Sequence, residues 1–283
     1  MTQRLAIIGD PVGHSISPAI YNATFPAMGI DAHYEAWPTP RDEVATAIEK
    51  LRADDMMGMN VTVPHKEAVL DLLDEVEPGA RAIGAVNCIT KRDGRLIGFN
   101  TDKAGFVESL RNAGFDPSLR RVLVLGVGGS ARAVCVGLIE AGVANLTLAG
   151  RRSEAVASLA AHLRATHPEA SIDEVSMDVG VLGVATAAAD LVVNTTPVGM
   201  HGTGSEDESP LPAAFLRQGL WVCDLVYRPP QTRLLRDTEA AGANALGGLE
   251  MLVLQAVESV KLWTGREPPV DIMRSAARSA LGL

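Results

Sequence analysis

A continuous apolar strand that runs directly into glycines is the feature of this 283-residue chain that most restricts its fold. Val122–Leu125 has the uninterrupted hydrophobic pattern of a strand buried in a parallel sheet. It leads into Gly126-x-Gly128-x-x-Ala131, which opens an Ala- and Val-rich helical segment. Gly126 allows a tight turn, Gly128 lets the backbone approach a diphosphate, and the small Ala131 permits close helix–strand packing. The predicted backbone contacts to a dinucleotide come from Gly126, Val127, Gly128, Gly129 and Ser130. The alternative is a strand–helix turn without a ligand.

Strands and helices alternate on both sides of this motif. Further strands are expected at Leu146–Leu148, Asp190–Asn194 and Leu220–Asp224, with a helix from Ser153. Such alternation is typical of a doubly wound α/β domain. The sequence therefore predicts a Rossmann-like domain over about residues 114–246, beginning with a linker at Gly114–Arg120.

The end of the strand after the glycine motif indicates which dinucleotide is bound. An NAD enzyme has an acidic residue there for the ribose 2′-hydroxyl, whereas this chain has Gly150-Arg151-Arg152. Two guanidinium groups suit a 2′-phosphate, because they bind it through charge-assisted hydrogen bonds. The sequence predicts NADP as the cofactor; the alternative is a pair of solvated arginines at a helix start.

The N-terminal part also alternates, in a pattern that predicts a mixed α/β sheet. Strands are expected at Leu5–Gly9 and Ala32–Trp37, and a hairpin is expected around residues 91–95. Ser17 is a suitable N-cap for a helix that has Pro18 at its first position and runs to about Met28. A second, amphipathic helix is expected at Arg41–Arg52.

A polar stretch, Asn60-Val61-Thr62-Val63-Pro64-His65-Lys66, joins one of these strands to the next element. Asn60 and Thr62 alternate with apolar residues, so they are expected on one face of the strand. Pro64 fits the first position of a helix, which places Lys66 in the first turn beside the positive end of the helix dipole. A cation is unfavourable there, so a ligand-binding role is indicated at this strand end, against the alternative of a surface lysine.

Three more helices are predicted, of which the first begins at Asp102 and the other two follow the C-terminal glycines. Asp102 opens a helix that extends to Asn112; its simplest interpretation is an N-cap. Gly247 and Gly248 precede a long apolar helix, Leu249–Trp263, and a short helix follows near residues 272–280.

Composition and cysteine usage exclude several classes of function. The net charge of −9 argues against nucleic-acid or anionic-membrane binding, and 47% hydrophobic residues supply sizeable cores. Cys88, Cys135 and Cys223 are far apart and the six histidines lack ligand spacing, so no metal or disulfide is predicted. No signal peptide or membrane-spanning run is expected, which predicts a cytoplasmic protein that binds a small molecule, as a monomer or homodimer.

The motifs, taken in order over nearly the whole chain, resemble those of the shikimate dehydrogenase family. They are Gly13-His14-Ser15-Ile16-Ser17-Pro18, Asn60–Glu67, Gly84–Asn87, Asn100–Asp102, Gly126–Ala131, Asn194–Met200, Asp224–Tyr227 and Met251–Ala256. The resemblance implies a reversible NADPH-dependent reduction of 3-dehydroshikimate to shikimate, a step of aromatic amino-acid biosynthesis. It also implies an N-terminal substrate domain of residues 1–102 and 249–283, with a cleft between it and the Rossmann-like domain.

The same resemblance implies a role for individual residues. Lys66 and Asp102 would be the catalytic pair, and Ser15 and Ser17 would bind the substrate carboxylate. The other implied substrate residues are Asn60, Thr62, Asn87 and Gln255, for the ring hydroxyls, and Tyr227. Leu225 and Gly248 would border the nicotinamide. Because Gln255 follows the cofactor domain in sequence, the C-terminal helix is expected to pack on the N-terminal domain.

Two residues depart from the family pattern. His65 stands where Phe or Tyr is common, and Glu250 stands where Gly or Pro is usual. A titrating imidazole beside Lys66 could perturb that lysine, and a carboxylate at residue 250 suits the first turn of a helix.

Two alternative functions stay open at this point. One is an enzyme that oxidises quinate as well as shikimate, which the motifs do not exclude. The other is a catalytically silent NADP-binding sensor, which would be expected to lack Lys66 or Asp102.

Overall fold

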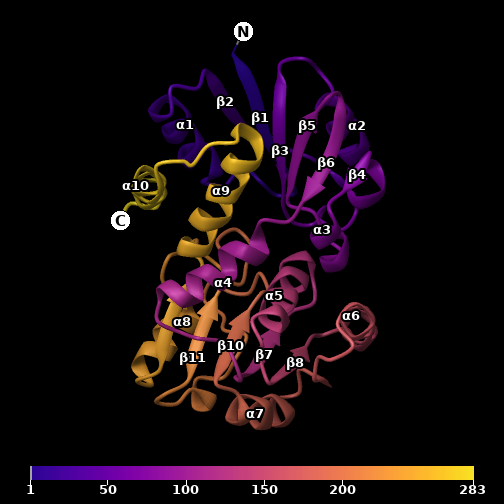
Figure 1. The fold of residues 1–283 in the computed structure, drawn as a ribbon. Coiled ribbons are helices and arrows are strands. Elements are labelled where there is room, and N and C mark those ends of the chain that lie inside the picture. The colour runs from indigo at the N-terminus through magenta and orange to yellow at the C-terminus, as the bar shows by residue number, and fades with distance from the viewer. Residues whose placement is uncertain (1) are drawn as a thin grey trace. The chain divides into compact units, whose positions relative to one another are not determined.

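The computed structural model describes residues 2–283, which divide into two compact units (Figure 1). The first unit contains the chain up to Gly105 together with Val253–Leu283, and the second contains Phe106–Leu252. The sequence analysis placed the corresponding boundaries at residues 102, 114, 246 and 249. Within the described residues, every helix is too short or too polar to cross a membrane.

The first unit is built on a six-stranded mixed sheet with the strand order β2-β1-β3-β5-β6-β4. Its strands are β1 (Gln3–Gly9), β2 (Ala32–Pro38), β3 (Met56–Val61), β4 (Glu75–Val76), β5 (Cys88–Arg92) and β6 (Arg95–Phe99). β1 runs parallel to β2 and β3, whereas β5 pairs antiparallel with both β3 and β6. The mixed sheet and the hairpin are therefore confirmed. The hairpin turn is Asp93-Gly94, and both residues have the positive φ that a tight two-residue turn requires.

The helices of the first unit come from both ends of the chain. They are α1 (Ser17–Ala27), η1 (Arg41–Glu43), α2 (Val44–Lys50), η2 (Leu70–Leu72), α3 (Pro78–Ile83), α10 (Val270–Ala280) and most of α9 (Leu249–Thr264). α1 packs against α10, so the N-terminal and C-terminal segments share one side of the sheet (Figure 1).

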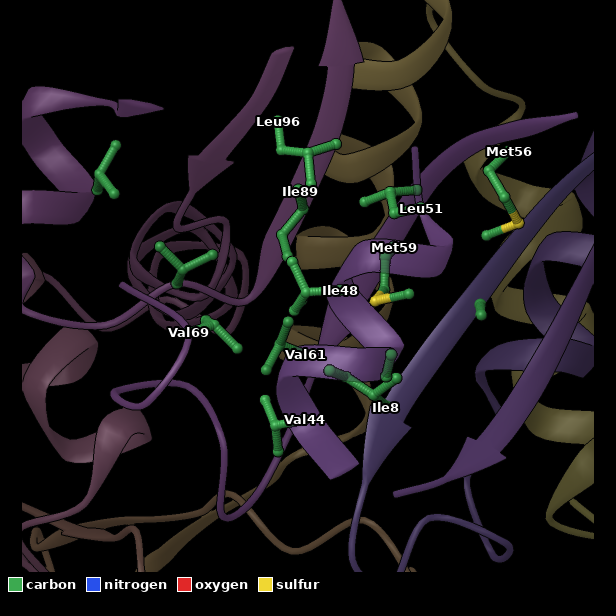
Figure 2. Packing of buried hydrophobic residues seen from close by; sticks show 14 of the residues in the cluster. Ile8, Val44, Ile48, Leu51, Met56, Met59, Val61, Val69, Ile89 and Leu96 are labelled. Atoms are coloured by element: carbon green, nitrogen blue, oxygen red, sulfur yellow. The ribbon is translucent and has the colours of Figure 1, made fainter. Parts of the chain in front are cut away.

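The alternation of residues along β3 assigns each of its faces to a different partner. Met59 and Val61 point into a hydrophobic cluster with Ile8 of β1 and Ile48 of α2 (Figure 2). Burying one large aliphatic side chain contributes about 1.5–3 kcal/mol, so this cluster is a main source of stability for the first unit.

The opposite face of β3 packs against α9. A Cβ on Gly58 would lie only 2.2 Å from Nε1 of Trp263, so the indole occupies the space that any larger residue would need. The same Nε1–H donates to the backbone oxygen of Ile89, at 3.0 Å. The C-terminal helix therefore packs on the N-terminal sheet, as the sequence analysis expects.

The second unit contains a six-stranded, all-parallel sheet in the order β12-β11-β10-β7-β8-β9. Its strands are β7 (Arg121–Leu125), β8 (Asn145–Ala149), β9 (Ile172–Val175), β10 (Leu191–Asn194), β11 (Trp221–Asp224) and β12 (Asn244–Gly247). The chain starts in the middle at β7, builds outward to β9, and then crosses back to β10. This is the order of a Rossmann-like domain, with a topological switch point between β7 and β10, and it confirms the predicted fold class.

The helices of the second unit connect these strands. They are most of α4 (Asp102–Asn112), then α5 (Gly129–Glu140), α6 (Ser153–Thr166), α7 (Val179–Ala188), the short η3 (Ala213–Phe215) and α8 (Arg233–Ala240). The sequence analysis did not locate β9, α7, α8 or β12. β9 is an edge strand with exposed Asp173 and Glu174, and α7 is apolar all round, so neither has the two-sided pattern that periodicity detects.

The close contact at Gly58 gives a direct test of how α9 is attached. We expect Gly58→Ala to lower the free energy of unfolding by about 1–3 kcal/mol, because the added methyl group overpacks the contact with Trp263. Chemical denaturation would measure the change. Gly13→Ala is the matched control, since a Cβ there meets nothing within 4 Å. Equal stabilities of the Gly58→Ala and wild-type proteins would contradict this packing.

Candidate active site

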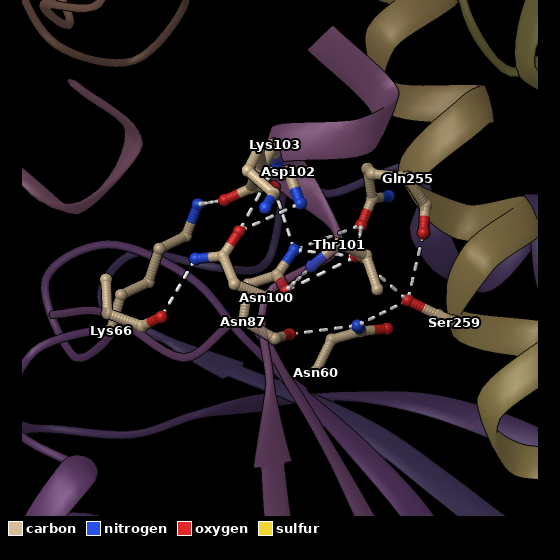
Figure 3. Close-up of polar contacts among 10 residues, drawn as sticks. Asn60, Lys66, Asn87, Asn100, Thr101, Asp102, Lys103, Gln255 and Ser259 are labelled. Atoms are coloured by element: carbon tan, nitrogen blue, oxygen red, sulfur yellow. Dashed lines mark hydrogen bonds and ion pairs between the residues drawn. The ribbon is translucent and has the colours of Figure 1, made fainter. Parts of the chain in front are cut away.

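A short, buried ion pair joins Lys66 to Asp102 (Figure 3). The Nζ of Lys66 lies 2.6 Å from Oδ2 of Asp102, and the side chains are only 10% and 7% exposed. A charge-assisted hydrogen bond of this length is among the stronger polar contacts in proteins. Removing either partner would leave the other charge buried and uncompensated, so each side chain holds the other in position.

The segment that carries Lys66 is a series of turns, so the prediction of a helix beginning at Pro64 is wrong. In a helix, the N–H of Leu70 would bond to the Lys66 carbonyl, but here it donates to Glu67, at 3.3 Å. The Lys66 carbonyl instead accepts from the N–H of Val86, at 2.8 Å. A contact with a distant segment has therefore replaced the local helical hydrogen bond, and Lys66 is not at a helix N-terminus.

Asp102 opens α4, as predicted, but capping is not the role of its side chain. The Oδ1 of Asn100 accepts from the backbone N–H groups of Asp102 and Lys103, at 3.1 and 3.4 Å, and so supplies the capping contact. The Asp102 carboxylate is instead bonded to Lys66 and Asn87. The Asp102 side chain is therefore not the N-cap of α4.

Asn87 connects the ion pair to the rest of the polar cluster. Its Oδ1 accepts from the backbone N–H of Thr101 at 2.7 Å, which fixes the orientation of the amide because that N–H can only donate. Its Nδ2 lies 2.8 Å from Oδ1 of Asp102 and 3.4 Å from Oε1 of Gln255. Both oxygens of the Asp102 carboxylate are therefore held, one by Lys66 and one by Asn87.

The side chain of Asn60 forms hydrogen bonds with three protein groups. Its Nδ2 donates to the Asn87 carbonyl at 3.0 Å and to Oγ of Ser259 at 3.2 Å, while its Oδ1 accepts from the Tyr34 hydroxyl at 2.7 Å. The sequence analysis assigned Asn60 to the substrate alone. In the structure it also holds α9 and β2 against β3.

The two serines expected at the substrate carboxylate lie at the start of α1. Ser17 is the first residue of the helix and Ile16 is its N-cap, so the prediction of Ser17 as N-cap is wrong. The Oγ of Ser15 accepts from the Ser17 N–H at 3.2 Å, because the loop folds back on this helix end. Nearby in the fold, Thr62 follows β3, and a Cβ on Gly9 would lie 2.4 Å from its methyl group. Gly9 is thus required for the close approach of these two strand ends.

In the second unit, the turn after β7 has the features that a diphosphate site needs. Gly126 has φ +107°, and a Cβ there would lie 2.4 Å from Oγ1 of Thr195. Gly128, the N-cap of α5, is exposed, and a Cβ there would meet nothing within 4 Å. The first glycine is therefore required by the fold, and the second leaves the backbone open at the N-terminus of a 12-residue helix, which fits a dinucleotide. Ala131 is fully buried, as close packing requires.

The arginines expected at the 2′-phosphate follow β8, the strand next to β7 in the sheet. Gly150 is close to Val156 and Val127, since its Cβ would lie 2.8 Å and 3.4 Å from their methyl groups. Arg151 and Arg152 follow it directly, and both are exposed. Exposed guanidinium groups at this strand end are available to an anionic ligand.

The residues expected at the nicotinamide lie together in the second unit. A Cβ on Gly248 would lie only 2.2 Å from the carbonyl oxygen of Leu225, so only glycine fits there. Leu225 follows β11, and its N–H donates to the carbonyl of Asn194, at 3.0 Å. Tyr227 is half-buried in the same loop.

A buried carboxylate fixes this loop. Asp224, at the end of β11, accepts from Nδ2 of Asn194 at 2.9 Å, Oγ1 of Thr232 at 2.7 Å and the N–H of Val226 at 3.1 Å. Burial raises the pKa of the Asp224 carboxyl to about 6, and the three hydrogen bonds offset part of that effect.

Comparisons with known proteins agree with this geometry. Residues 7–89 match the model of the shikimate dehydrogenase substrate binding domain, and residues 248–278 match that of the shikimate 5′-dehydrogenase C-terminal domain. The shikimate dehydrogenase (NADP(+)) of Moorella thermoacetica is 43% identical over 281 residues, covering 99% of this chain and 94% of that protein. The chain belongs to the shikimate dehydrogenase family.

Solved structures of related enzymes are similar to this chain in fold as well as in sequence. The shikimate 5-dehydrogenase of Thermus thermophilus, in complex with NADP(H) and shikimate, has a TM-score of 0.86 and 38% identity, covering 99% of this chain and 100% of that chain. The quinate dehydrogenase of Corynebacterium glutamicum, in complex with NAD, has a TM-score of 0.89 and 32% identity, covering 98% and 99%. This chain therefore has the same overall fold as both of these enzymes.

The two departures from the family pattern have different surroundings. His65 is 1% exposed, and its Nε2–H donates to the carbonyl of Thr39 at 2.7 Å, so the imidazole ties the Lys66 segment to the loop after β2. Glu250 is half-buried in the first turn of α9, where the helix dipole favours an acid. Within residues 2–283, no group of three or more His, Cys, Asp or Glu side chains is placed to hold a metal ion.

Three residues of the polar cluster were missed as site residues by the sequence analysis: Tyr34, Thr101 and Ser259. Ser259 lies one helical turn after Gln255, so the i, i+4 spacing could have indicated it. Thr101 lies within a motif already recognised, between Asn100 and Asp102. Tyr34 gives no local signal, because its partner is 26 residues away in the sequence.

The buried Asp224 predicts a specific pH dependence of stability. Its folded-state pKa is above the ordinary value of 3.8, so the folded state binds the proton more tightly and stability falls as pH rises from about 4 to about 6. Asp224→Asn removes this titration. We expect the stability of the variant relative to wild type to increase over that range, on the order of 2–3 kcal/mol. Hydrogen exchange in β10 and β11 would measure the stability of both proteins at each pH. A stability difference between variant and wild type that does not change with pH would contradict the raised pKa of Asp224.

Proposed function

We propose that this chain is an NADP-dependent shikimate dehydrogenase, which reversibly reduces 3-dehydroshikimate to shikimate in aromatic amino-acid biosynthesis. The observation that carries the proposal is the buried Lys66–Asp102 pair, joined to Gln255 through Asn87. The relatives that match over nearly the whole chain are shikimate dehydrogenases, and one solved structure of that name contains both NADP(H) and shikimate.

The reaction requires a hydride, a proton and a fixed carbonyl group. NADPH, when bound, supplies the hydride, and the protein manages the proton and the position of the substrate. Lys66 donates the proton to the reacting oxygen and takes it back in the reverse direction. Asp102 holds the ammonium group in place, and Asn87 holds the carboxylate of Asp102.

The remaining first-unit residues are proposed to bind the substrate. Ser15 and Ser17 carry hydroxyl groups at the positive end of α1, where a carboxylate is favoured. Thr62, Asn87 and Gln255 are proposed to bind the ring hydroxyls, and a substrate lacking one of them would leave buried polar groups unpaired. Asn60 is proposed to contribute through its side-chain oxygen.

The second-unit residues are proposed to bind NADP. The open backbone from Gly126 to Ser130 is proposed to hold the diphosphate, and Arg151 and Arg152 the 2′-phosphate. Leu225 and Gly248 are proposed to lie beside the nicotinamide, and Tyr227 to contact the substrate. The domain assignment, with residues 1–102 and 249–283 for substrate and 114–246 for NADP, belongs to the same proposal.

A dual shikimate and quinate activity is the second candidate, favoured by the likeness to a quinate dehydrogenase. Steady-state kinetics with shikimate and quinate, each with NADP and NAD, would separate the candidates. We expect the highest kcat/KM with shikimate and NADP. Comparable kcat/KM for quinate would establish the dual enzyme, and the absence of turnover with every pair would refute both and leave a binding protein.

We also propose a cytoplasmic location and a monomeric or homodimeric state. The three cysteines are buried free thiols, and burial raises the pKa of Cys88 to about 12, which suits a reducing compartment in which they stay inert. Light scattering at several concentrations would establish the oligomeric state.

The role of Lys66 can be tested by substitution. We expect Lys66→Ala to lower kcat by about 10²- to 10⁴-fold with a smaller change in the KM for shikimate, because general acid–base groups contribute in that range. Asp102→Asn should lower kcat/KM, and the double variant should lose less than the sum of the two effects. Lys50→Ala, an exposed lysine on α2, is the control. A near-normal kcat for Lys66→Ala would exclude this lysine as the proton donor.

Cofactor choice can be tested at the arginine pair. Replacing Arg151 and Arg152 together with Ala should weaken NADP binding by about 2–4 kcal/mol, because charge-assisted hydrogen bonds to the 2′-phosphate are lost. Binding of NAD should change little, since it lacks that phosphate. Arg236→Ala, an exposed arginine on α8, is the control. Equal losses for NADP and NAD, measured by fluorescence titration, would exclude the assignment.

A further inference from the structure

The hydroxyl group of Ser259 joins α9 to strand β3 and to the short loop between β6 and α4. Ser259 is fully buried, and its Oγ lies 3.0 Å from the backbone oxygen of Gln255, one turn earlier in the helix. The same Oγ lies 3.2 Å from Nδ2 of Asn60 and 3.3 Å from Oγ1 of Thr101 (Figure 3). The Oγ of Ser259 thus contacts both Asn60, a proposed substrate residue, and Thr101, which directly precedes Asp102 in the chain.

The contacts of Asn60 determine which way its amide points. The carbonyl of Asn87 can only accept, so the group 3.0 Å from it must be the Asn60 nitrogen. The second N–H of that nitrogen then donates to Ser259, and the Asn60 oxygen accepts from the Tyr34 hydroxyl. Both N–H groups are used, and one lone pair on Oδ1 remains for a ligand.

We propose that Tyr34 and Ser259 are positioning residues that make Asn60 a hydrogen-bond acceptor, and not a donor, toward a hydroxyl group of the substrate. Ser259 has a second effect, because Thr101 in turn contacts Asn87, which holds Asp102. The inference rests on the proposed function and extends it to substrate selection. The group facing Asn60 must donate a hydrogen bond, so a ketone or methyl ether at that place is excluded.

Substitutions of Tyr34 and of Ser259 are expected to have different kinetic effects. Tyr34→Phe removes only the hydroxyl and keeps the ring, which stacks on Tyr21 at 4.3 Å between centroids. We expect it to raise the KM for shikimate about three- to tenfold, the value of one net hydrogen bond, with kcat within about twofold of wild type. Ser259→Ala should raise KM similarly and also lower kcat, because it acts on Thr101 as well.

A double-mutant cycle with Asn60→Ala distinguishes positioning from general destabilisation. If Tyr34 acts through Asn60, Tyr34→Phe should leave KM unchanged in the Asn60→Ala background, although it raises KM in the wild-type background. Thr24→Val is the matched control, since Thr24 is a buried helical residue whose hydroxyl also donates to the carbonyl four residues earlier. It should leave both constants unchanged. Melting temperatures would be measured for every variant.

Several results would overturn the inference. They are an unchanged KM in Tyr34→Phe, an equal rise of KM in the Asn60→Ala background, or the same kinetic effects in Thr24→Val. Calorimetric titration with shikimate gives a readout independent of turnover and should show the same order of affinities. A wild-type protein that does not oxidise shikimate would refute the proposed function instead, whereas an active wild type with unaffected Tyr34→Phe would refute only this inference.

Discussion

Two opposite charges, those of Lys66 and Asp102, lie 2.6 Å apart where both side chains are nearly excluded from water. Burying either charge alone would cost several kcal/mol, so the surrounding chain has to hold the two side chains within hydrogen-bond distance of each other. It does so through a closed set of contacts. The Lys66 carbonyl accepts from Val86, and the next residue, Asn87, binds the free oxygen of the Asp102 carboxylate. The pair is therefore formed by the protein itself, before any substrate contributes.

Close approach of neighbouring segments explains why several positions near the proposed sites are glycine. Gly58 accommodates the indole of Trp263, which attaches α9 to the sheet and so brings Ser259 and Gln255 to the polar cluster. Gly126 and Gly248 have a comparable role in the second unit, where each lies against the backbone or side chain of a neighbouring loop. The proposed substrate and cofactor groups thus depend on positions where no side chain fits.

Much of the fold follows from local patterns in the sequence, whereas parts of the site do not. The apolar strand before Gly126 and the alternation in β3 predict the Rossmann-like unit and the two faces of the first sheet. The helix expected at Pro64 is absent because Val86 takes the Lys66 carbonyl, a contact that no local pattern shows. The bond between Asn60 and Ser259 spans 199 residues, so its effect on the amide could not be predicted from spacing either.

The most direct test of the account is a crystal structure of the protein with shikimate bound. We expect Nζ of Lys66 to lie about 2.6–3.2 Å from the hydroxyl oxygen that becomes the carbonyl, the reach that proton transfer requires. The bond between Lys66 and Asp102 should be retained, and the side-chain oxygen of Asn60 should accept from another ring hydroxyl. A complex in which shikimate lies away from Lys66, or in which Asp102 has left Lys66 to bind elsewhere, would contradict it.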